Sequence, residues 1–170
     1  MSDPFDLTGH VALVVGAAAG GLGERAAATL AAAGATVVTA DLDPADVDHG
    51  VDVTDEAGVD ALVDRVIADH GRLDVLVNAA GLMLRKPYDE TTLAEFERVV
   101  RVNLTGTWLL DRAAGRAMAA AGRGRIVNLT AVYAERVGPV PESAYYASKA
   151  GVANVTRALA AELGPHGVSV

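Results

Sequence analysis

Short apolar runs alternate with helix-like segments along the chain, and this alternation constrains the fold more than any other feature. The apolar, β-branched runs lie at residues 10–15, 36–40, 73–77 and 125–129. Segments with helical spacing or an alanine-rich composition lie at residues 22–33, 56–70, 92–121 and 143–163. This order is typical of βαβ units, in which helices cover both faces of a parallel sheet. We therefore predict an α/β fold with a doubly wound parallel sheet.

Three parts of this pattern are less regular. Residues 51–53 are compatible with a short third strand, and the region 92–121 is either one helix or two helices that break near 103–106. Residues 167–170 begin a further strand where the chain ends. We therefore expect a single domain over residues 1–170 whose last strand or strands are missing.

The composition excludes several classes of protein. The chain has 170 residues, of which 51% are hydrophobic, so it can bury one sizeable core. Its net charge of −8 disfavours binding to nucleic acid and to anionic membranes. It has no cysteine, which excludes a disulfide scaffold and a thiol nucleophile. The histidines and aspartates lack the spacing of zinc or calcium sites, so we expect no metal.

The N-terminus predicts the location of the protein. The first six residues are acidic and no apolar segment follows them, so we expect no signal peptide. The longest alanine-rich stretch is too short to span a bilayer. These features predict a cytoplasmic protein that does not contact membranes.

A glycine-rich turn, GAAAGGLG at residues 16–23, joins the first predicted strand to the first predicted helix. Small residues let backbone N–H groups approach a pyrophosphate, and the helix N-terminus stabilises its charge. Asp41 follows eighteen positions after Gly23, at the end of the second strand. A carboxylate there accepts hydrogen bonds from both hydroxyls of an adenine ribose and repels a 2′-phosphate. The pattern favours NAD over NADP; the alternative is a plain tight turn with a solvated acid.

Tyr145 and Lys149 are spaced i, i+4 at the start of a predicted helix, so their side chains lie on one face. A phenol with a pKa of about 10 is a poor acid–base catalyst near neutrality. A nearby ammonium group and a positively charged nicotinamide would lower that pKa toward the working range. The alternative is an ordinary amphipathic helix with a surface lysine, because both residues are common.

Together these motifs resemble the short-chain dehydrogenase/reductase family in its compact form. The matching segments occur in family order over essentially the whole chain: the glycine-rich turn, Asp41, VDVTD at 51–55, NAAG at 78–81, VNLTG at 102–106, RIVNL at 125–129 and Tyr145-x-x-x-Lys149. The resemblance implies a Rossmann-like fold and an NAD-dependent oxidoreductase. Such an enzyme interconverts a secondary alcohol and a ketone, and it is a homodimer or homotetramer.

The resemblance also implies a role for each matching residue. The pyrophosphate would lie on Gly16, Gly21, Leu22 and Gly23. Asp41 and Leu42 would hold the adenine ribose, Asp52 and Val53 would flank the adenine, and Asn78, Ala79, Ala80 and Gly81 would line the cleft. Tyr145 would be the general acid/base, Lys149 would bind the nicotinamide ribose, and Asn103 would hold a water in the proton relay.

The sequence departs from the family pattern in four places, and two of them, Ala131 and the missing C-terminal part, support an alternative function. Val15 replaces a threonine, and one extra alanine separates Gly16 from Gly21. Ala131 stands where the family has its catalytic serine. Successive side chains of a strand point to opposite faces, so Thr130 could replace the missing hydroxyl only if the strand ends in a bulge or twist. Ser143 is a weaker candidate. The turn at 78–81 varies mildly, and the substrate-covering part of the family fold does not follow residue 170. The alternative is an NAD-binding fragment or pseudoenzyme without catalysis.

Overall fold

The computed structural model describes residues 5–170, so the first four residues, on which the expectation about a signal peptide rests, lie outside the described part. Its centre is one parallel sheet with the strand order β3-β2-β1-β4-β5-β6. The strands are β1 (Val11–Val15), β2 (Thr36–Asp41), β3 (His49–Gly50), β4 (Val75–Asn78), β5 (Gly124–Asn128) and β6 (Val168–Ser169). All five residues of β1 are buried, as expected for the central strand of a parallel sheet. The predicted doubly wound, Rossmann-like α/β fold is confirmed.

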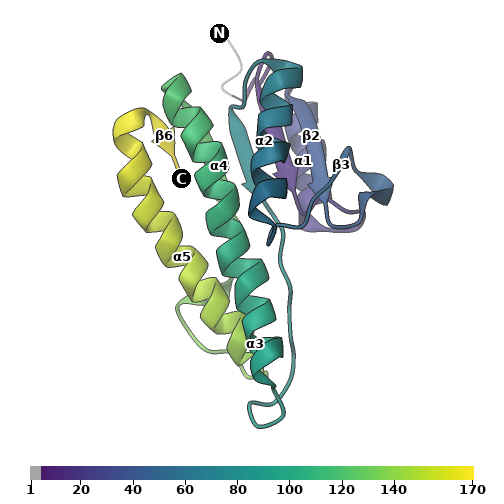
Figure 1. Cartoon of the computed structure of the whole chain (residues 1–170), viewed down its shortest axis with the longest axis vertical. Helices are drawn as coiled ribbons and strands as arrows, with labels where there is room; N and C mark the ends of the chain where they lie inside the picture. The colour runs from purple at the N-terminus through teal and green to yellow at the C-terminus, as the bar shows by residue number, and fades with distance from the viewer. Residues whose placement is uncertain (1–4) are drawn as a thin grey trace.

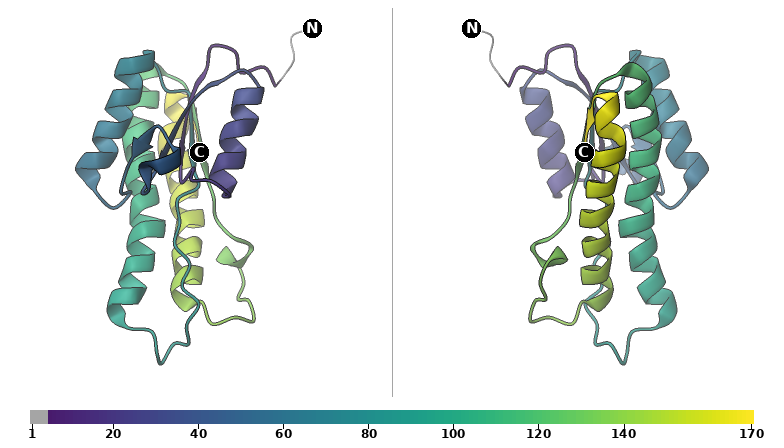
Figure 2. Two further views of the ribbon diagram at one scale, coloured as in Figure 1. Left: turned by 90° about the vertical axis from the view of Figure 1, so that its right-hand side faces the viewer. Right: turned by 90° about the vertical axis from the view of Figure 1, so that its left-hand side faces the viewer.

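The helices cover the two faces of this sheet unequally (Figures 1 and 2). They are α1 (Leu22–Ala32), α2 (Glu56–His70), α3 (Leu93–Val100), α4 (Gly106–Ala121) and α5 (Ser143–Leu163). Helices α2, α4 and α5 lie on one face, and α1 lies on the other, where Ala27 packs with Val14 and Val77. Within residues 5–170 no helix covers the β5 side of that second face, and Val127 there is 47% exposed.

Two irregular segments differ from the sequence pattern. The third strand is His49–Gly50 and not residues 51–53: the Val51 N–H still bonds to the Asp41 carbonyl (2.8 Å), but the chain then turns into the core. The region 92–121 is a continuous helical rod, in which the π-helical segment η2 (Arg101–Thr105) separates α3 from α4. Such π-turns often mark functional sites. This one positions Asn103.

The ends of the helices are determined by local sequence. Asp55 caps α2 by accepting a hydrogen bond from the Ala57 N–H, and Gly71, with a φ of 74°, ends that helix. Thr92 and Glu95 form a capping box at the start of α3. Glycine is needed at position 71 because L-residues rarely adopt a positive φ. Over residues 5–170, every helix is too short or too polar to span a bilayer.

A carboxyl group is buried between α4, β5 and α5. Asp111 has no exposed surface, and its Oδ2 accepts a hydrogen bond from Asn128 Nδ2 at 2.7 Å. Among the residues described, Asp111 Oδ1 and Asn128 Oδ1 have no hydrogen-bond partner. Burial raises the pKa of Asp111 to about 7, and the Asn128 hydrogen bond opposes this only in part. The folded chain therefore keeps this proton at pH values where the unfolded chain has released it.

We predict that this group lowers stability as the pH rises. The folded state binds more protons than the unfolded state between the ordinary aspartate pKa of 3.8 and about 7, so the free energy of unfolding falls across that window. Asp111→Asn cannot titrate, and its amide oxygen can still accept the Asn128 hydrogen bond. Urea unfolding measures the free energy of unfolding at pH 5 and at pH 8. The decrease between these two pH values should be smaller by roughly 2 kcal/mol in Asp111→Asn than in the unmodified chain. Equal decreases in both proteins would contradict the prediction.

Candidate functional site

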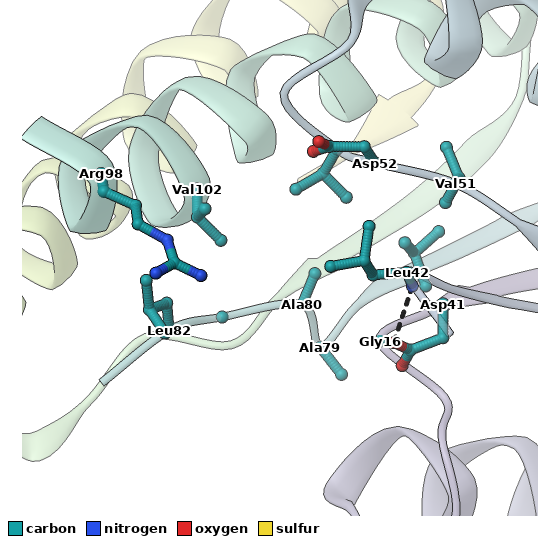
Figure 3. Close-up of a pocket in the computed structure, with 13 residues that line it drawn as sticks. Gly16, Asp41, Leu42, Val51, Asp52, Ala79, Ala80, Leu82, Arg98 and Val102 are labelled. Carbon is teal, nitrogen blue, oxygen red and sulfur yellow. Dashed lines mark hydrogen bonds between the residues drawn. The ribbon is translucent and has the colours of Figure 1, made fainter. Parts of the chain in front are cut away.

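A cleft of about 280 Å³ opens at the carboxyl ends of β1, β2 and β4 (Figure 3). The strand order reverses between β1 and β4, and doubly wound sheets bind ligands at this point. Eight residues predicted to bind a cofactor line this cleft: Gly16, Asp41, Leu42, Asp52, Val53, Ala79, Ala80 and Gly81. The structure therefore brings together segments from four separate parts of the sequence.

The glycine-rich turn forms one wall of the cleft. Gly16 has a φ of 82°, and a Cβ on it would collide with the Ala80 backbone nitrogen. A Cβ on Gly23 would likewise collide with the Gly16 carbonyl oxygen. Gly21 has an ordinary φ of −92°. Gly20, which was not among the predicted site residues, has a φ of 83° and is the second left-handed residue of the turn after Gly16. The absence of a side chain at position 16 therefore lets residues 79–80 pack this closely against the turn.

The first turn of α1 faces the same region. Gly21 is its N-cap and provides no side-chain hydrogen bond to the helix. Leu22, the first residue of α1, is 73% exposed, and Leu42 across the turn is 70% exposed. Uncapped N–H groups at a helix N-terminus favour an anion. Exposed leucines of this size are suited to contact with a ligand that covers them.

Asp41 is fixed at the rim of the cleft by backbone groups. Its Oδ2 accepts a hydrogen bond from the Ala18 N–H (2.9 Å), and its Oδ1 accepts one from the Leu42 N–H (2.7 Å), which is drawn in Figure 3. The first of these bonds ties the glycine-rich turn to the end of β2. Each carboxylate oxygen has a second lone pair, so both can also accept a hydrogen bond from a ligand.

Asp52 lies across the cleft from Asp41 and Leu42 (Figure 3). Its Oδ1 accepts hydrogen bonds from the N–H and the hydroxyl of Thr54, both at 2.8 Å, and these bonds lower the pKa of Asp52. Val53 beside it is buried. The carboxylate is therefore charged at neutral pH and held in one orientation.

Asn78 does not line the cleft, in contrast to the expectation from the resemblance. Its side chain is buried, with Nδ2 donating to Thr107 Oγ1 (2.8 Å) and Oδ1 accepting from the Ala80 N–H (3.2 Å). It lies at the end of β4, where its side chain turns toward α4. Asn78 therefore supports the turn 79–81 from below.

Asn103 is fully buried and holds the next part of the same segment. Its Oδ1 accepts the Leu82 N–H (2.6 Å), and its Nδ2 donates to the Leu82 carbonyl and to Ser148 Oγ (both 2.9 Å). Ser148 Oγ in turn donates to the Tyr145 carbonyl at 2.8 Å. Asn103 thus connects the floor of the cleft to the helix that carries Tyr145.

Tyr145 and Lys149 lie on one face of α5, as their spacing predicts. The Lys149 ammonium is buried, donates to the Leu129 carbonyl (2.5 Å) and lies 5.9 Å from the centre of the Tyr145 ring. A Cβ on Gly81 would be 3.7 Å from Lys149 Nζ. The cofactor cleft and the Tyr145–Lys149 pair therefore share Gly81 as a border.

The expectation that Lys149 and a bound nicotinamide together lower the pKa of Tyr145 stays a prediction, because the structure describes the chain without a cofactor. Burial raises the pKa of Tyr145, and the charge of Glu142 raises it further. Burial also lowers the pKa of Lys149, whose ammonium is directed at the Leu129 carbonyl. With these groups alone, the phenol keeps its proton at neutral pH.

The structure corrects the prediction that Thr130 supplies the hydroxyl missing at Ala131. Thr130 Oγ1 donates its proton to the Lys149 carbonyl at 2.9 Å. Ala131 has extended backbone, with φ −145° and ψ 157°, so neighbouring side chains continue to alternate between faces. Ser143, the first residue of α5, is exposed, and within the described part of the chain its hydroxyl has no hydrogen-bond partner.

The cleft is also lined by residues that were not predicted to bind a cofactor: Val15, Val51, Leu82, Arg98 and Val102. Arg98 extends from α3 toward Leu82 and the cleft (Figure 3). Arg98 and Val102 are spaced i, i+4 on the helical rod, so helical spacing counted back from Val102, the first residue of the VNLTG segment, was the available signal for Arg98. Over residues 5–170, no three acidic or histidine side chains gather in a way that could hold a metal ion.

Comparisons with known proteins agree with this geometry. The sequence model of the family described as short chain dehydrogenase matches residues 10–170. The chain is 40% identical to a D-threitol dehydrogenase from Mycolicibacterium smegmatis, over 98% of this chain and 69% of that protein. It is 43% identical to a cis-4-hydroxycyclohexanecarboxylate dehydrogenase from Sinomonas cyclohexanicum, over 95% of this chain and 70% of that protein.

A solved structure has the same arrangement of elements. The crystal structure of a short-chain type dehydrogenase/reductase from Mycobacterium marinum superposes with a TM-score of 0.92 at 33% sequence identity. The match covers 98% of this chain and 74% of that one. At this identity and coverage, the likeness extends through the cleft as well as the sheet.

Proposed function

The chain belongs to the short-chain dehydrogenase/reductase family, and we propose that it is an NAD-dependent oxidoreductase that interconverts a secondary alcohol and a ketone. One observation carries this proposal. Gly81 borders both the cleft and the Lys149 ammonium, so a ligand that fills the cleft reaches the Tyr145–Lys149 pair. Dehydrogenation of an alcohol needs a cofactor site and a proton acceptor at this kind of junction.

The residues present fit a nicotinamide dinucleotide. Gly16 lets the backbone of residues 79–80 pack against the glycine-rich turn at the edge of the cleft, and the N–H groups at the start of α1 have no side-chain cap. In the proposed arrangement the pyrophosphate lies on Gly16, Gly21, Leu22 and Gly23, the adenine ribose on Asp41 and Leu42, the adenine beside Asp52 and Val53, and the nicotinamide ribose on Lys149. Ala79, Ala80 and Gly81 form the floor. Bound NAD supplies the hydride acceptor, and NADH the hydride donor.

Tyr145 is the proposed general acid/base. Its Oη holds the proton that the substrate hydroxyl gives up in oxidation and returns that proton in reduction. The Lys149 ammonium, 5.9 Å from the ring centre, stabilises the phenolate that forms when Tyr145 loses its own proton. Asn103 fixes the position of the cofactor cleft relative to the helix that carries Tyr145, because it bonds both Leu82 and Ser148.

The second candidate function is a protein that binds NAD without catalysis, and Ala131 favours it. Loss of one hydrogen-bond donor to a developing oxyanion costs roughly 3 kcal/mol, about a hundredfold in rate. Thr130 does not replace this hydrogen-bond donor in the structure, because its hydroxyl donates to the backbone carbonyl of Lys149. This candidate predicts cofactor binding without turnover.

We also propose that the protein acts on a small molecule in the cytoplasm, binds neither nucleic acid nor membrane, and forms a homodimer or homotetramer. An apolar hollow between α4 and α5 supports the oligomer. It is lined by Leu104, Trp108, Gly151, Val155 and Ala158, with Trp108 41% exposed. The net charge of −8 supports the exclusion of anionic partners.

The cofactor preference predicts selective stabilisation. NADH at a hundred times its Kd should add about 2.7 kcal/mol to the free energy of unfolding, and NADPH should add much less, because Asp41 repels the 2′-phosphate. Thermal unfolding with each cofactor measures this difference. Asp41→Asn should reduce the selectivity. Asp46→Asn, which changes the same charge at an exposed position outside the cleft, should leave it intact. Equal shifts with both cofactors in the unmodified chain would refute the NAD preference.

The proposed acid/base role predicts that Tyr145→Phe lowers kcat by about 10²- to 10⁴-fold on an active secondary alcohol, with little change in NADH binding. Tyr88→Phe removes the same hydroxyl from a side chain that is 84% exposed, and it should keep full activity. Steady-state assays of cyclic alcohols and polyols measure both variants. Turnover that survives in Tyr145→Phe would rule out this role. NADH binding with no turnover, not restored by Ala131→Ser, would favour the non-catalytic candidate.

A further inference from the structure

Two loops border Tyr145, and adjacent contacts join them. The loop 79–92 follows β4 and the loop 129–142 follows β5; both extend past the carboxyl ends of the strands toward the N-terminal end of α5 (Figures 1 and 2). The Lys86 N–H donates to the Pro141 carbonyl at 2.8 Å. Next to it, Arg85 Nε donates to Glu142 Oε1 at 2.7 Å. Consecutive residues of one loop thus bind consecutive residues of the other.

The two partners of this ion pair differ strongly in exposure. The Glu142 side chain is 3% exposed, whereas that of Arg85 is 62% exposed. A buried carboxylate loses its hydration and needs compensation from a partner. Arg85 provides that compensation, and the N-terminus of α5, directly after Glu142, adds a favourable dipole. Neither residue has a role in the cofactor cleft.

Glu142 also lies close to Tyr145 along the chain. Its backbone carbonyl accepts the Tyr146 N–H at 2.9 Å, so it forms the first turn before the helix that carries Tyr145. We propose that Arg85 and Glu142 are a positioning pair for Tyr145: the pair fastens the loop 79–92 to the start of α5, and the Glu142 charge, offset by Arg85, acts on the Tyr145 hydroxyl. The importance of this pair for catalysis rests on the proposed role of Tyr145.

The N-terminal end of α5, which carries Tyr145, and the elements packed against it hold several ionisable groups. They are Lys149 and Tyr146 on α5, Tyr133 and Glu142 on the loop before it, Arg85 and Lys86 on the loop 79–92, and Glu95 of α3, which pairs with Lys86. Burial is the larger cause of the raised pKa of Tyr145, and among these groups Glu142 is the charge that raises it further. Removal of the Glu142 charge should therefore lower that pKa, and removal of the Arg85 charge should raise it.

Opposite shifts distinguish this electrostatic role from simple packing. We would follow the ¹³Cζ signal of Tyr145 by NMR across a pH titration, with Tyr145→Phe to assign it. The protein alone is sufficient, without substrate or cofactor. Glu142→Gln should lower the titration midpoint by roughly half a pH unit, and Arg85→Gln should raise it by a similar amount. Arg85→Lys keeps the charge and should stay near the unmodified value.

Asp89→Asn is the matched control, because it removes one negative charge from an exposed position of the same loop. Its midpoint should not move, since solvent screens the charge. Unchanged midpoints in both Glu142→Gln and Arg85→Gln would overturn the proposal, and so would shifts in the same direction. If Glu142→Gln does not fold, the two Arg85 variants decide. A higher Tyr145 titration midpoint in Arg85→Gln, together with an unchanged midpoint in Arg85→Lys, supports the proposal. An unchanged midpoint in Arg85→Gln overturns it.

The titration is independent of turnover. A chain that oxidises no alcohol but shows the opposite shifts would refute the proposed function while the pair's effect on Tyr145 stands. A chain that is active but shows no shifts would refute only the role of the pair.

Discussion

The site depends on one close contact between two backbone segments. The turn at residues 79–80 lies directly against Gly16, at a separation that no side chain at position 16 would allow. This contact brings the ends of β1 and β4 together and closes the floor of the cleft. Asp41 then ties the glycine-rich turn to β2 through the Ala18 N–H. Three strand ends are thereby held as one rigid rim.

Buried amides carry this arrangement across to the catalytic helix. Asn78 and Asn103 hold the segment 79–82 by neutral hydrogen bonds, and Asn103 reaches α5 through Ser148. Amides suit this task because they donate and accept at once, without the solvation cost of a buried charge. The charged groups lie at the edge of this network: Lys149 beside Gly81, and Glu142 with Arg85 beyond Tyr145. The network fixes positions, and the charges set proton affinities.

Much of this could be predicted from sequence because the signals are local. Apolar runs marked the strands and glycines marked helix ends. The motifs shared with the family indicated eight residues that line the cleft. Asn78 was misplaced, since its inward orientation depends on Thr107, which is far away in the sequence. The orientation of the Thr130 hydroxyl likewise depends on the Lys149 carbonyl.

The buried carboxyl groups gave no signal at all. In the sequence Glu142 reads as a solvated residue after Pro141, and Asp111 as one acid on an amphipathic helix. Only the packing of α4, β5 and the two loops buries them. The sequence indicated a possible break near residues 103–106, but not that a π-helical segment at Arg101–Thr105 would keep the rod continuous and place Asn103 in the core.

A crystal structure of the chain with NADH would test the central claim most directly, namely that the Gly16 contact builds a dinucleotide site that ends at Tyr145. We expect the adenine ribose hydroxyls on Asp41, the pyrophosphate on the glycine-rich turn, and the nicotinamide between Gly81 and Tyr145. A dinucleotide bound elsewhere, or with its ribose away from Asp41, would contradict the account.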